Sequence, residues 1–365
     1  MRRTHRRCVP ATNTNETCDP ASGGTNPPPR LLSLIPHPSS LIPHPSSLIP
    51  LRVSYHPDYV VPLPEKHAFP MGKFSALHEI LLAEGVITPE AVMAPREAEI
   101  SDLLLVHTRE YLDALATSTL SRPDERRMGL PQSPALWRRS RRAVQGTLNA
   151  CLAALTDARG LAGNLAGGTH HAHPDGGRGF CVLNDVAVAL RALRRSGWVR
   201  RAIVIDLDVH QGDGTAFIFS GARGWPRGGV YTFSMHGAKN YPFVKPPSTR
   251  DVPLADGTGD AEYLDVLARE LPLALEAADP DLVVYLAGVD VLEGDRFGRL
   301  SLSHQGLAAR DRYVCETVKA SGLPLCLLLS GGYATRGQRA DRRTSAYDTA
   351  DLHATVYREA AAVYA

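Results

Sequence analysis

Two absences narrow the class of protein first. The 365-residue chain has six cysteines, none in a Cys-x-x-Cys spacing, which excludes a disulfide scaffold and a cysteine-built zinc finger and fits a reducing, cytoplasmic setting. No apolar run approaches the roughly 20 residues that a membrane helix needs. The arginines near the N-terminus are followed by a polar stretch rather than an apolar one, so the sequence predicts neither an export signal nor a membrane protein.

An excess of charge of one sign is also lacking. The formal net charge is +2, from 40 basic and 38 acidic residues. Six of the basic and two of the acidic residues lie in 1–52, so the rest carries 34 and 36, a net charge of −2. A body this close to neutrality gives no electrostatic footprint for direct nucleic-acid binding. The short cluster of Arg138, Arg139, Arg141 and Arg142 is interpreted as a solvated helix face.

Residues 1–50 do not have the pattern of a folded domain. They contain Asn-Pro-Pro-Pro and a seven-residue repeat, Ser-Leu-Ile-Pro-His-Pro-Ser, at 33–39 and 40–46. Two prolines in each repeat exclude helix interiors and central strands. We expect a disordered low-complexity tail over 1–50, which a start site assigned too far upstream would also explain, and one folded domain over 51–365.

From residue 52 onward, short apolar runs alternate with longer helical stretches. Strands are predicted at 53–55, 161–167, 202–208, 230–235, 282–288 and 325–331, and helices at 73–84, 133–157, 184–196, 261–278 and 303–321. Continuous apolar strands separated by helices of this length indicate a parallel sheet that is covered on both faces. The sequence therefore predicts a single-domain α/β fold with an open, mostly parallel sheet.

Three polar side chains end the predicted strand at 202–208. Asp206, Asp208 and His210 alternate with apolar residues, so the strand period of two points them to one side. Burying three such groups at the end of a strand costs free energy unless they are paired or coordinate a metal. Oxygen and nitrogen donors together suit Zn²⁺ or another borderline divalent ion.

A further carboxylate, Asp290, follows the apolar part of the predicted strand at 282–288. With Asp208 and His210 it would give three protein ligands and leave a fourth position open for water. Open coordination marks a catalytic metal site, whereas structural zinc sites are closed. These residues therefore predict one catalytic metal ion.

Two more motifs follow predicted strands. His170 and His171 come after the strand at 161–167, and adjacent imidazoles suit general acid–base work once partners such as Asp206 and Asp213 fix their tautomers. Tyr333 ends the motif Ser-Gly-Gly-Tyr after the strand at 325–331. The glycines permit a tight turn that would bring the phenol over the site as a donor to a developing oxyanion.

Taken in order, the motifs resemble those of the histone deacetylase superfamily, which includes bacterial deacetylases and acetylpolyamine amidohydrolases on an arginase-like α/β fold. The matching segments are GGTHHA at 167–172, GFCVLND at 179–185, DLDVHQGDG at 206–214, AGVDVLEGD at 287–295 and SGGY at 330–333. Segments at 236–243, 256–263 and 290–298 look most like the class IV branch and its bacterial relatives. The resemblance implies that residues 51–365 form a deacetylase-like catalytic domain.

The resemblance also implies the ions that the site would hold. Asp208, His210 and Asp290 would bind one catalytic Zn²⁺, with Fe²⁺ as the alternative ion. A structural K⁺ is expected as well, bound by Asp206, Asp208, His210, Ser234 and the backbone of Met235.

Roles for the remaining polar residues follow from the same resemblance. His171, oriented by Asp213, would act as general base and then as general acid. His170, held by Asp206, would be its electrostatic partner. Tyr333 would polarise the acyl carbonyl and stabilise the tetrahedral oxyanion.

Aromatic residues would form the substrate tunnel. Phe180 would line it, with Tyr241 or Phe243 on the opposite wall, around the methylene chain of an acyl-lysine. The polyamine-selective branch of the family has a gate glutamate seven residues after the aspartate ligand, and Phe297 stands at that position here. This departure argues against polyamine substrates.

Two other positions depart from the pattern of the family. Gln211 replaces a second histidine that many relatives have next to the ligand His210, which should tune the site without abolishing it. An arginine-rich stretch at 335–347 follows Tyr333 and could disturb the tyrosine loop.

The sequence thus predicts a zinc amidohydrolase that removes acetyl or longer acyl groups from lysine side chains of proteins or peptides. Two alternatives stay open, namely a deacetylase of small molecules such as acetylpolyamines and a catalytically silent acyl-lysine binding module. A two-manganese ureohydrolase is disfavoured because Gly288 and Leu292, rather than a second carboxylate, flank Asp290. The oligomeric state is left open.

Overall fold

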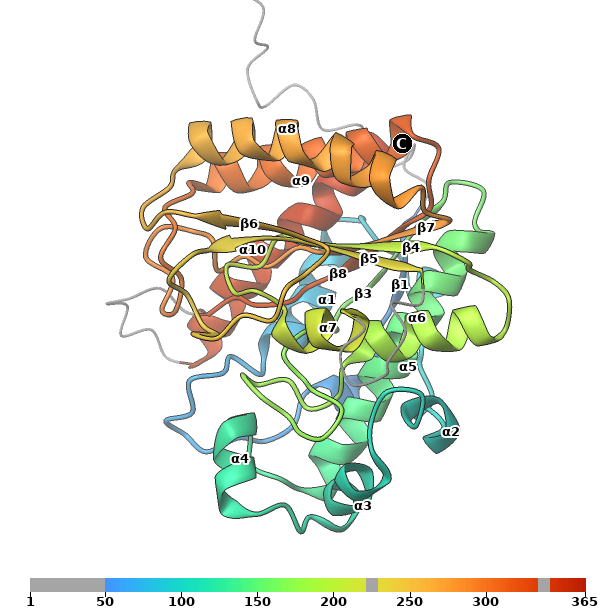
Figure 1. The fold of residues 1–365 in the computed structure, drawn as a ribbon, viewed down its shortest axis with the longest axis vertical. Helices are drawn as coiled ribbons and strands as arrows, with labels where there is room; N and C mark the ends of the chain where they lie inside the picture. The colour runs from blue at the N-terminus through green and yellow to red at the C-terminus, as the bar shows by residue number, and fades with distance from the viewer. Residues whose placement is uncertain (1–49, 221–228, 334–341) are drawn as a thin grey trace, which may run out of the picture. The chain divides into compact units, whose positions relative to one another are not determined.

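A parallel β-sheet forms the centre of the protein (Figure 1). The computed structural model describes residues 50–220, 229–333 and 342–365, all within the compact unit Pro43–Ala365. The tail predicted over 1–50 lies outside the described residues, apart from its last residue. The first part of the arginine-rich stretch, 335–341, lies outside them as well.

Within the described residues the sheet has eight strands, all parallel, in the order β2-β1-β3-β8-β7-β4-β5-β6. The strands are β1 (Arg52–Ser54), β2 (Val92–Met93), β3 (Leu161–Asn164), β4 (Ala202–Asp206), β5 (Val230–Gly237), β6 (Arg250–Leu254), β7 (Leu282–Leu286) and β8 (Leu325–Leu328). Every residue of β3, β4, β7 and β8 is buried, because helices cover both faces of the sheet.

The helices form the two outer layers. They are α1 (Lys73–Ala83), α2 (Ile100–Leu103), α3 (Arg109–Thr117), α4 (Arg122–Met128), α5 (Pro134–Thr156), α6 (Asp185–Arg195), α7 (Asp213–Phe219), α8 (Asp260–Ala278), α9 (His304–Ala320) and α10 (Arg342–Val363), with 3₁₀ turns at Pro57–Tyr59 and Pro89–Ala91. Helices α8 and α9 lie on one face of the sheet, and α5, α6 and α7 on the other (Figure 1). Helix α10 packs against α9, and α1 against α10.

Helix starts are encoded by local side chains. Ser133, Asn184 and Ser303 are the N-caps of α5, α6 and α9, and each accepts a hydrogen bond from a backbone N–H of the first turn. All three predicted helices therefore begin within one residue of their predicted starts. No helix in the described ranges is long and apolar enough to cross a bilayer.

The predicted α/β fold with a parallel sheet is confirmed, and each of the six predicted strands is present. The strands that were not predicted are the sheet edges β2 and β6. Strand β6 contains Pro253 and exposes Arg250 and Pro253, so it does not show the continuous apolar run by which the central strands are recognised.

The prediction for the arginine cluster on α5 is wrong. Of its four members only Arg138 is exposed. Arg139 is buried, with its Nε donating to the backbone oxygen of Tyr59 at 3.0 Å and its guanidinium 4.9 Å from the centre of the Phe74 ring. Arg141 and Arg142 are partly buried in ion pairs with carboxylates outside α5.

The topology fixes where the motifs meet. Strands β3, β8, β7 and β4 are neighbours at the centre of the sheet, and each of the four polar motifs lies just beyond the carboxyl end of one of them. The carboxyl edge of an open α/β sheet is where ligands bind. The fold therefore brings all four motifs to one place.

Buried neutral histidines make the fold sensitive to acid. Burial lowers the pKa of His107 to about 4, and its Nε2 accepts from the backbone N–H of Asn184 while Nδ1 bonds the oxygen of His173. An unfolded histidine has a pKa of about 6.5. Between these values the unfolded chain binds the proton more readily, so stability is lost as pH falls from 6.5 toward 4.

We therefore expect the free energy of unfolding to fall by about 2 kcal/mol for this group between pH 7 and pH 5. Urea unfolding of the wild type and of His107→Asn at both pH values measures how much His107 contributes to this decrease. The variant lacks the titrating imidazole, so its free energy of unfolding should fall by about 2 kcal/mol less. The exposed His304→Asn is the matched control and should keep it. An equal decrease in the wild type and in both variants would contradict this assignment.

Candidate active site

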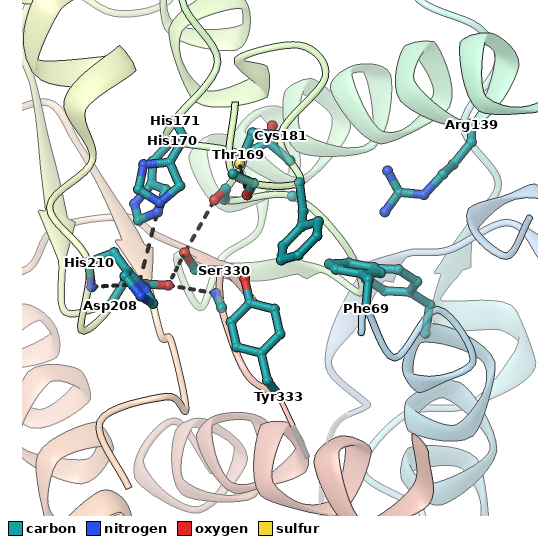
Figure 2. Close-up of a pocket in the computed structure, with 16 residues that line it drawn as sticks. Phe69, Arg139, Thr169, His170, His171, Cys181, Asp208, His210, Ser330 and Tyr333 are labelled. Atoms are coloured by element: carbon teal, nitrogen blue, oxygen red, sulfur yellow. Dashed lines mark hydrogen bonds and ion pairs between the residues drawn. The ribbon is translucent and has the colours of Figure 1, made fainter. Parts of the chain in front are cut away.

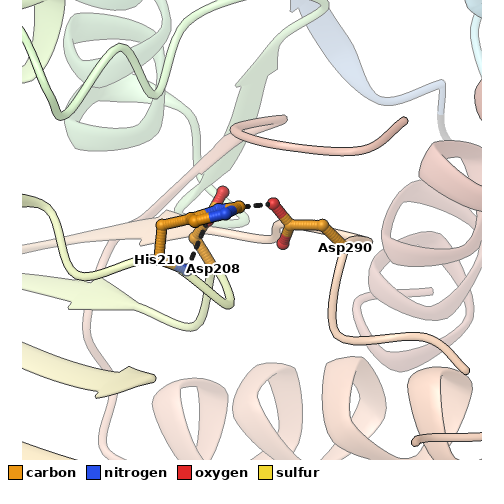
Figure 3. A group of neighbouring side chains, drawn as sticks. All are labelled: Asp208, His210 and Asp290. Carbon is orange, nitrogen blue, oxygen red and sulfur yellow. Dashed lines mark hydrogen bonds and ion pairs between the residues drawn. The ribbon is translucent and has the colours of Figure 1, made fainter. Parts of the chain in front are cut away.

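The predicted site residues meet in one cleft at the carboxyl edge of the sheet (Figure 2). His170 and His171, Asp208 and His210, and the loop Ser330–Tyr333 line its inner part. These residues come from the ends of β3, β8 and β4, which are far apart in sequence. In the sheet, β3 and β8 are neighbours and only β7 separates β8 from β4. Asp290 reaches the same place from the end of β7 (Figure 3).

The three predicted metal ligands converge as expected (Figure 3). The Nδ1 atom of His210 lies 3.0 Å from Oδ1 of Asp208 and 3.1 Å from Oδ2 of Asp290. One donor atom from each residue lies within 4.8 Å of the others, and all three side chains are buried. Such closely spaced carboxylate and imidazole donors can hold a single ion.

The charges of this group fit a divalent cation. Burial and the neighbouring Asp208 carboxylate raise the pKa of Asp290. Burial alone would lower the pKa of His210, but hydrogen bonds to Asp208 and Asp290 raise it to about 10. The site therefore attracts positive charge, and its oxygen and nitrogen donors are those of a borderline ion such as Zn²⁺.

Surrounding groups orient the carboxylates. Ser330 donates through Oγ to Oδ2 of Asp208 at 2.8 Å, and the Gly331 backbone N–H donates to the same oxygen at 2.6 Å. The Val209 N–H donates to Oδ1 of Asp290 at 3.0 Å. A Cβ atom at Gly331 would collide with both carboxylates, so the glycine is needed for close approach as well as for the turn.

The two adjacent histidines have different partners, as predicted. Nδ1 of His170 lies 2.7 Å from Oδ2 of Asp206, and Nδ1 of His171 lies 2.6 Å from Oδ1 of Asp213. Burial opposes the charged form of His170, but Asp206 and Asp208 raise its pKa to about 9. Burial and the neighbouring His170 lower the pKa of His171 to about 4. The pair thus combines one charged and one neutral imidazole.

A second histidine shares the partner of His171. Nε2 of His173 lies 3.0 Å from Oδ2 of Asp213, so the carboxylate bridges two imidazoles. Burial raises the pKa of Asp213, but the hydrogen bonds from His171 and His173 outweigh it and keep that pKa below its usual value. Asp213 therefore remains an acceptor for the proton on Nδ1 of His171, which leaves Nε2 as the basic nitrogen.

The residues expected to hold K⁺ come from the ends of the neighbouring strands β4 and β5. Asp206 pairs in register with Ser234 across β4 and β5, and Met235 follows on β5. All of them are buried, as are Asp208 and His210, which follow β4. Oγ of Ser234 contacts Nδ1 of His236 at 2.9 Å. Binding of K⁺ here stays a prediction.

Gln211 turns away from the metal ligands. Its amide nitrogen donates to the backbone oxygen of Pro246 at 2.7 Å and to Oδ1 of Asp251 on β6 at 2.9 Å. The side chain therefore fixes the segment before β6 against the loop that carries His210, which is consistent with a tuning role.

The predicted tunnel residues lie outside the metal group. Phe180 lies 5.7 Å from the Tyr333 ring, and Phe297 lies 4.8 Å from it. Tyr241 stands edge-on to His171, with ring centres 5.0 Å apart. Together with Phe243 these residues line a cleft of about 580 Å³. Phe243 is 87% exposed, which places it at the mouth rather than in a tunnel wall.

The Tyr333 ring is buried beside these aromatic residues, and its hydroxyl points into the inner cleft (Figure 2). Burial and the carboxylates of Asp290 and Asp208 raise the pKa of this phenol well above its usual value, so it stays a proton donor. Its backbone N–H donates to Oδ2 of Asp295 at 3.0 Å, and Oδ1 of the same carboxylate accepts from the N–H groups of Phe297 and Gly298.

Sequence reasoning missed the residues that hold the tyrosine loop (Ser330–Tyr333) in place. Lys73 of α1 is buried, with Nζ 3.3 Å from the Ser330 oxygen, 3.4 Å from the Gly332 oxygen and 3.1 Å from Nε2 of His353 on α10. Burial lowers the pKa of Lys73 to about 8. No local signal marks this lysine, because its partners lie more than 250 residues away in the sequence.

The close approach at Gly331 generates a prediction for metal binding. We expect Gly331→Ala to weaken Zn²⁺ binding at least about tenfold, because the added methyl group displaces the carboxylates of Asp208 and Asp290. Competition with a chromophoric chelator measures the affinity. Gly176→Ala is the matched control, since a Cβ there meets nothing within 4 Å. Equal Zn²⁺ affinities for the two variants would contradict the prediction and show that the loop can move away from the carboxylates without weakening metal binding.

Comparison with known proteins identifies the family. The family model of the histone deacetylase domain matches residues 67–347. An uncharacterised protein of Picosynechococcus sp. is 45% identical over 312 residues, which cover 86% of this chain and 99% of the relative. Histone deacetylase 2 of Arabidopsis thaliana is 33% identical, covering 75% of this chain and 71% of its own. The acetoin utilization protein AcuC of Staphylococcus aureus is 26% identical over 67% of this chain and 66% of its own.

Solved structures share the fold. A histone deacetylase homologue in complex with SAHA superposes with a TM-score of 0.65 at 25% identity and covers 84% of each chain. An acetylpolyamine aminohydrolase from Burkholderia pseudomallei gives 0.63 at 22% identity, over 84% of this chain and 98% of its own. With the family model spanning most of the chain and the Arabidopsis relative above 30% identity, this protein belongs to the histone deacetylase family.

Proposed function

We propose that this member of the family hydrolyses the side-chain amide of acyl-lysine in proteins or peptides, with one Zn²⁺ ion, and is nearest to the class IV branch. One observation carries the proposal. The Asp208–His210–Asp290 group, the His171–Asp213 pair and the hydroxyl of Tyr333 converge at the inner end of one aromatic-walled cleft. Each part that amide hydrolysis needs is therefore present at one point.

The inner residues divide the work of the reaction. A divalent ion held by Asp208, His210 and Asp290 would act as a Lewis acid toward the acyl carbonyl and the attacking water. His171 is neutral and its Nδ1 proton is held by Asp213. Its Nε2 can therefore take a proton from the water and return it to the leaving lysine nitrogen.

Tyr333 stabilises the negative charge that develops on the acyl oxygen, and His170 sets the charge of the neighbouring base. Tyr333 stays protonated because burial raises the pKa of its phenol, so it can donate a hydrogen bond to that oxygen. His170 carries a positive charge and lies next to His171, with ring centres 4.1 Å apart. Burial of His171 and this charge keep His171 neutral before the reaction starts.

The cleft wall supports an acylated rather than a free lysine. The Phe180, Phe297 and Tyr333 rings lie within 6.2 Å of one another, and among the described residues no acidic side chain lines the outer cleft to receive an ammonium group. Moving a charged ammonium into such surroundings is costly, whereas the neutral acyl-lysine stem carries no such penalty. Product lysine would therefore leave the site readily.

Two alternatives are less well supported. A small-molecule acetylpolyamine deacetylase would need to accept a cation, and Phe297 stands where the polyamine-selective branch has its gate glutamate. A catalytically silent binder would not require the two orienting carboxylates Asp206 and Asp213, both of which engage their histidines at 2.6 to 2.7 Å.

Turnover of a defined panel tests the proposal. Full-length Zn²⁺-loaded protein is assayed with uncharged-flank peptides carrying acetyl-, octanoyl- or myristoyl-lysine, and with acetylspermidine. We expect at least one peptide to be hydrolysed. Asp290→Ala should abolish metal binding and turnover, whereas Tyr333→Phe should retain the metal and lower kcat by roughly 10²-fold or more.

Each outcome has one reading. Hydrolysis of acetylspermidine alone would move the protein to small-molecule chemistry. Peptide binding without any hydrolysis would favour the binding module. Unchanged kcat in Tyr333→Phe would remove this phenol from the mechanism.

The support of the tyrosine loop gives a further prediction. Lys73→Met keeps the volume of the buried side chain but removes its donors to the Ser330 and Gly332 oxygens. We expect kcat to fall roughly 10-fold or more through misplacement of Tyr333, with little change in KM. Lys73→Arg should recover part of the loss, and the exposed Lys66→Met is the matched control. A kcat equal to that of wild type in Lys73→Met would show that the loop is held without this lysine.

A further inference from the structure

The mouth of the cleft is positively charged, whereas the chain beyond residue 52 has a slight net negative charge. Four basic side chains line the outer cleft: Arg126 and Arg127 of α4, Lys239 between β5 and β6, and Arg299 between β7 and α9. No acidic side chain lines it among the described residues. Three segments far apart in the sequence therefore contribute positive charge to one opening.

Neighbouring carboxylates offset only part of this charge. Asp124 lies 3.1 Å from Arg127, and Asp256 is shared between Arg299 at 3.3 Å and Lys239 at 3.8 Å. Two carboxylates thus stand against four cations.

The basic side chains reach into solvent rather than into the inner cleft. The side chains of Arg127 and Arg299 are each 52% exposed, and that of Lys239 is 74% exposed. The aromatic rings of Phe180 and Tyr333 lie deeper, between this rim and the metal ligands. An anionic group that meets these cations would therefore lie outside the tunnel, beside the acyl-lysine rather than on its acyl chain.

From this arrangement we infer that the substrate is a protein or peptide segment in which the acyl-lysine is flanked by aspartate or glutamate. The inference rests on the proposed function and adds the substrate class to it. Like charges on one rim sum to a potential that attracts an acidic segment and raises its association rate. The same potential repels lysine-rich tails and cationic acetylpolyamines.

The test compares peptides that share one acyl-lysine and differ only in the residues on each side of it. Three peptides carry the same acyl group, with two residues on each side that are acidic, uncharged or basic. With full-length Zn²⁺-loaded protein at low salt, we expect kcat/KM to fall about 10-fold or more from the acidic to the basic peptide, mainly through KM. The difference should shrink as NaCl rises to 0.5 M, because exposed charges are screened.

Charge reversal at the rim identifies the residues. In the double variant Arg126→Glu/Arg299→Glu, the ratio of kcat/KM for acidic over basic peptide should drop below one. Arg138→Glu is the matched control, because this exposed arginine of α5 does not line the cleft. It should keep the wild-type ratio.

The outcomes separate this inference from the proposed function. Hydrolysis of the uncharged peptide with equal kcat/KM for all three flanks would overturn the inference and leave the function standing. No hydrolysis of any peptide would overturn both. Inhibition by a single-stranded oligonucleotide at lower concentration than by the acidic peptide would assign the rim to nucleic acid instead. A stronger preference for succinyl-lysine than for acidic flanks would place the anion in the tunnel and also overturn the inference.

Discussion

The burial of two carboxylates side by side governs this structure. Asp208 and Asp290 are both fully buried and share the imidazole of His210. Removing two like charges from water is costly unless hydrogen bonds and a cation compensate. The backbone N–H groups of Val209 and Gly331 supply some of these bonds, and that requirement explains why the loop after β8 approaches so closely that only glycine fits.

The buried carboxylates also determine the charge and position of the residues around them. Asp206 and Asp208 both face His170 and hold that imidazole in its charged form, whereas burial and this charge keep the neighbouring His171 neutral. Lys73 donates to the Ser330 and Gly332 oxygens and is itself in contact with His353, so it holds the loop whose Ser330 and Gly331 bond Asp208. The helices α1 and α10 thus contribute to a site that is otherwise built from strand ends.

Sequence patterns predicted the parts of this site that are local in the chain. Asp206, Asp208 and His210 were recognisable because they continue an apolar strand, and Asp290 because it follows another. Lys73 and Asp295 were not, since their contacts depend on how α1 and the loop after β7 pack against the tyrosine loop. Arg139 was predicted to be solvated from its charged neighbours, but the packing of α5 against Tyr59 and Phe74 buries it.

The cleft has two charged zones, a buried negative zone at its inner end and an exposed positive zone at its mouth. At the inner end, negative carboxylates attract a metal ion, and the low exposure of the surroundings makes this attraction strong and insensitive to salt. At the mouth, exposed arginines and a lysine act through solvent, where each pair contributes little but several like charges add. The aromatic rings between the zones contribute neither sign. Under the proposed function, an acylated side chain would be selected for its neutrality in the inner cleft, while the sequence around it would be selected separately by charge at the rim.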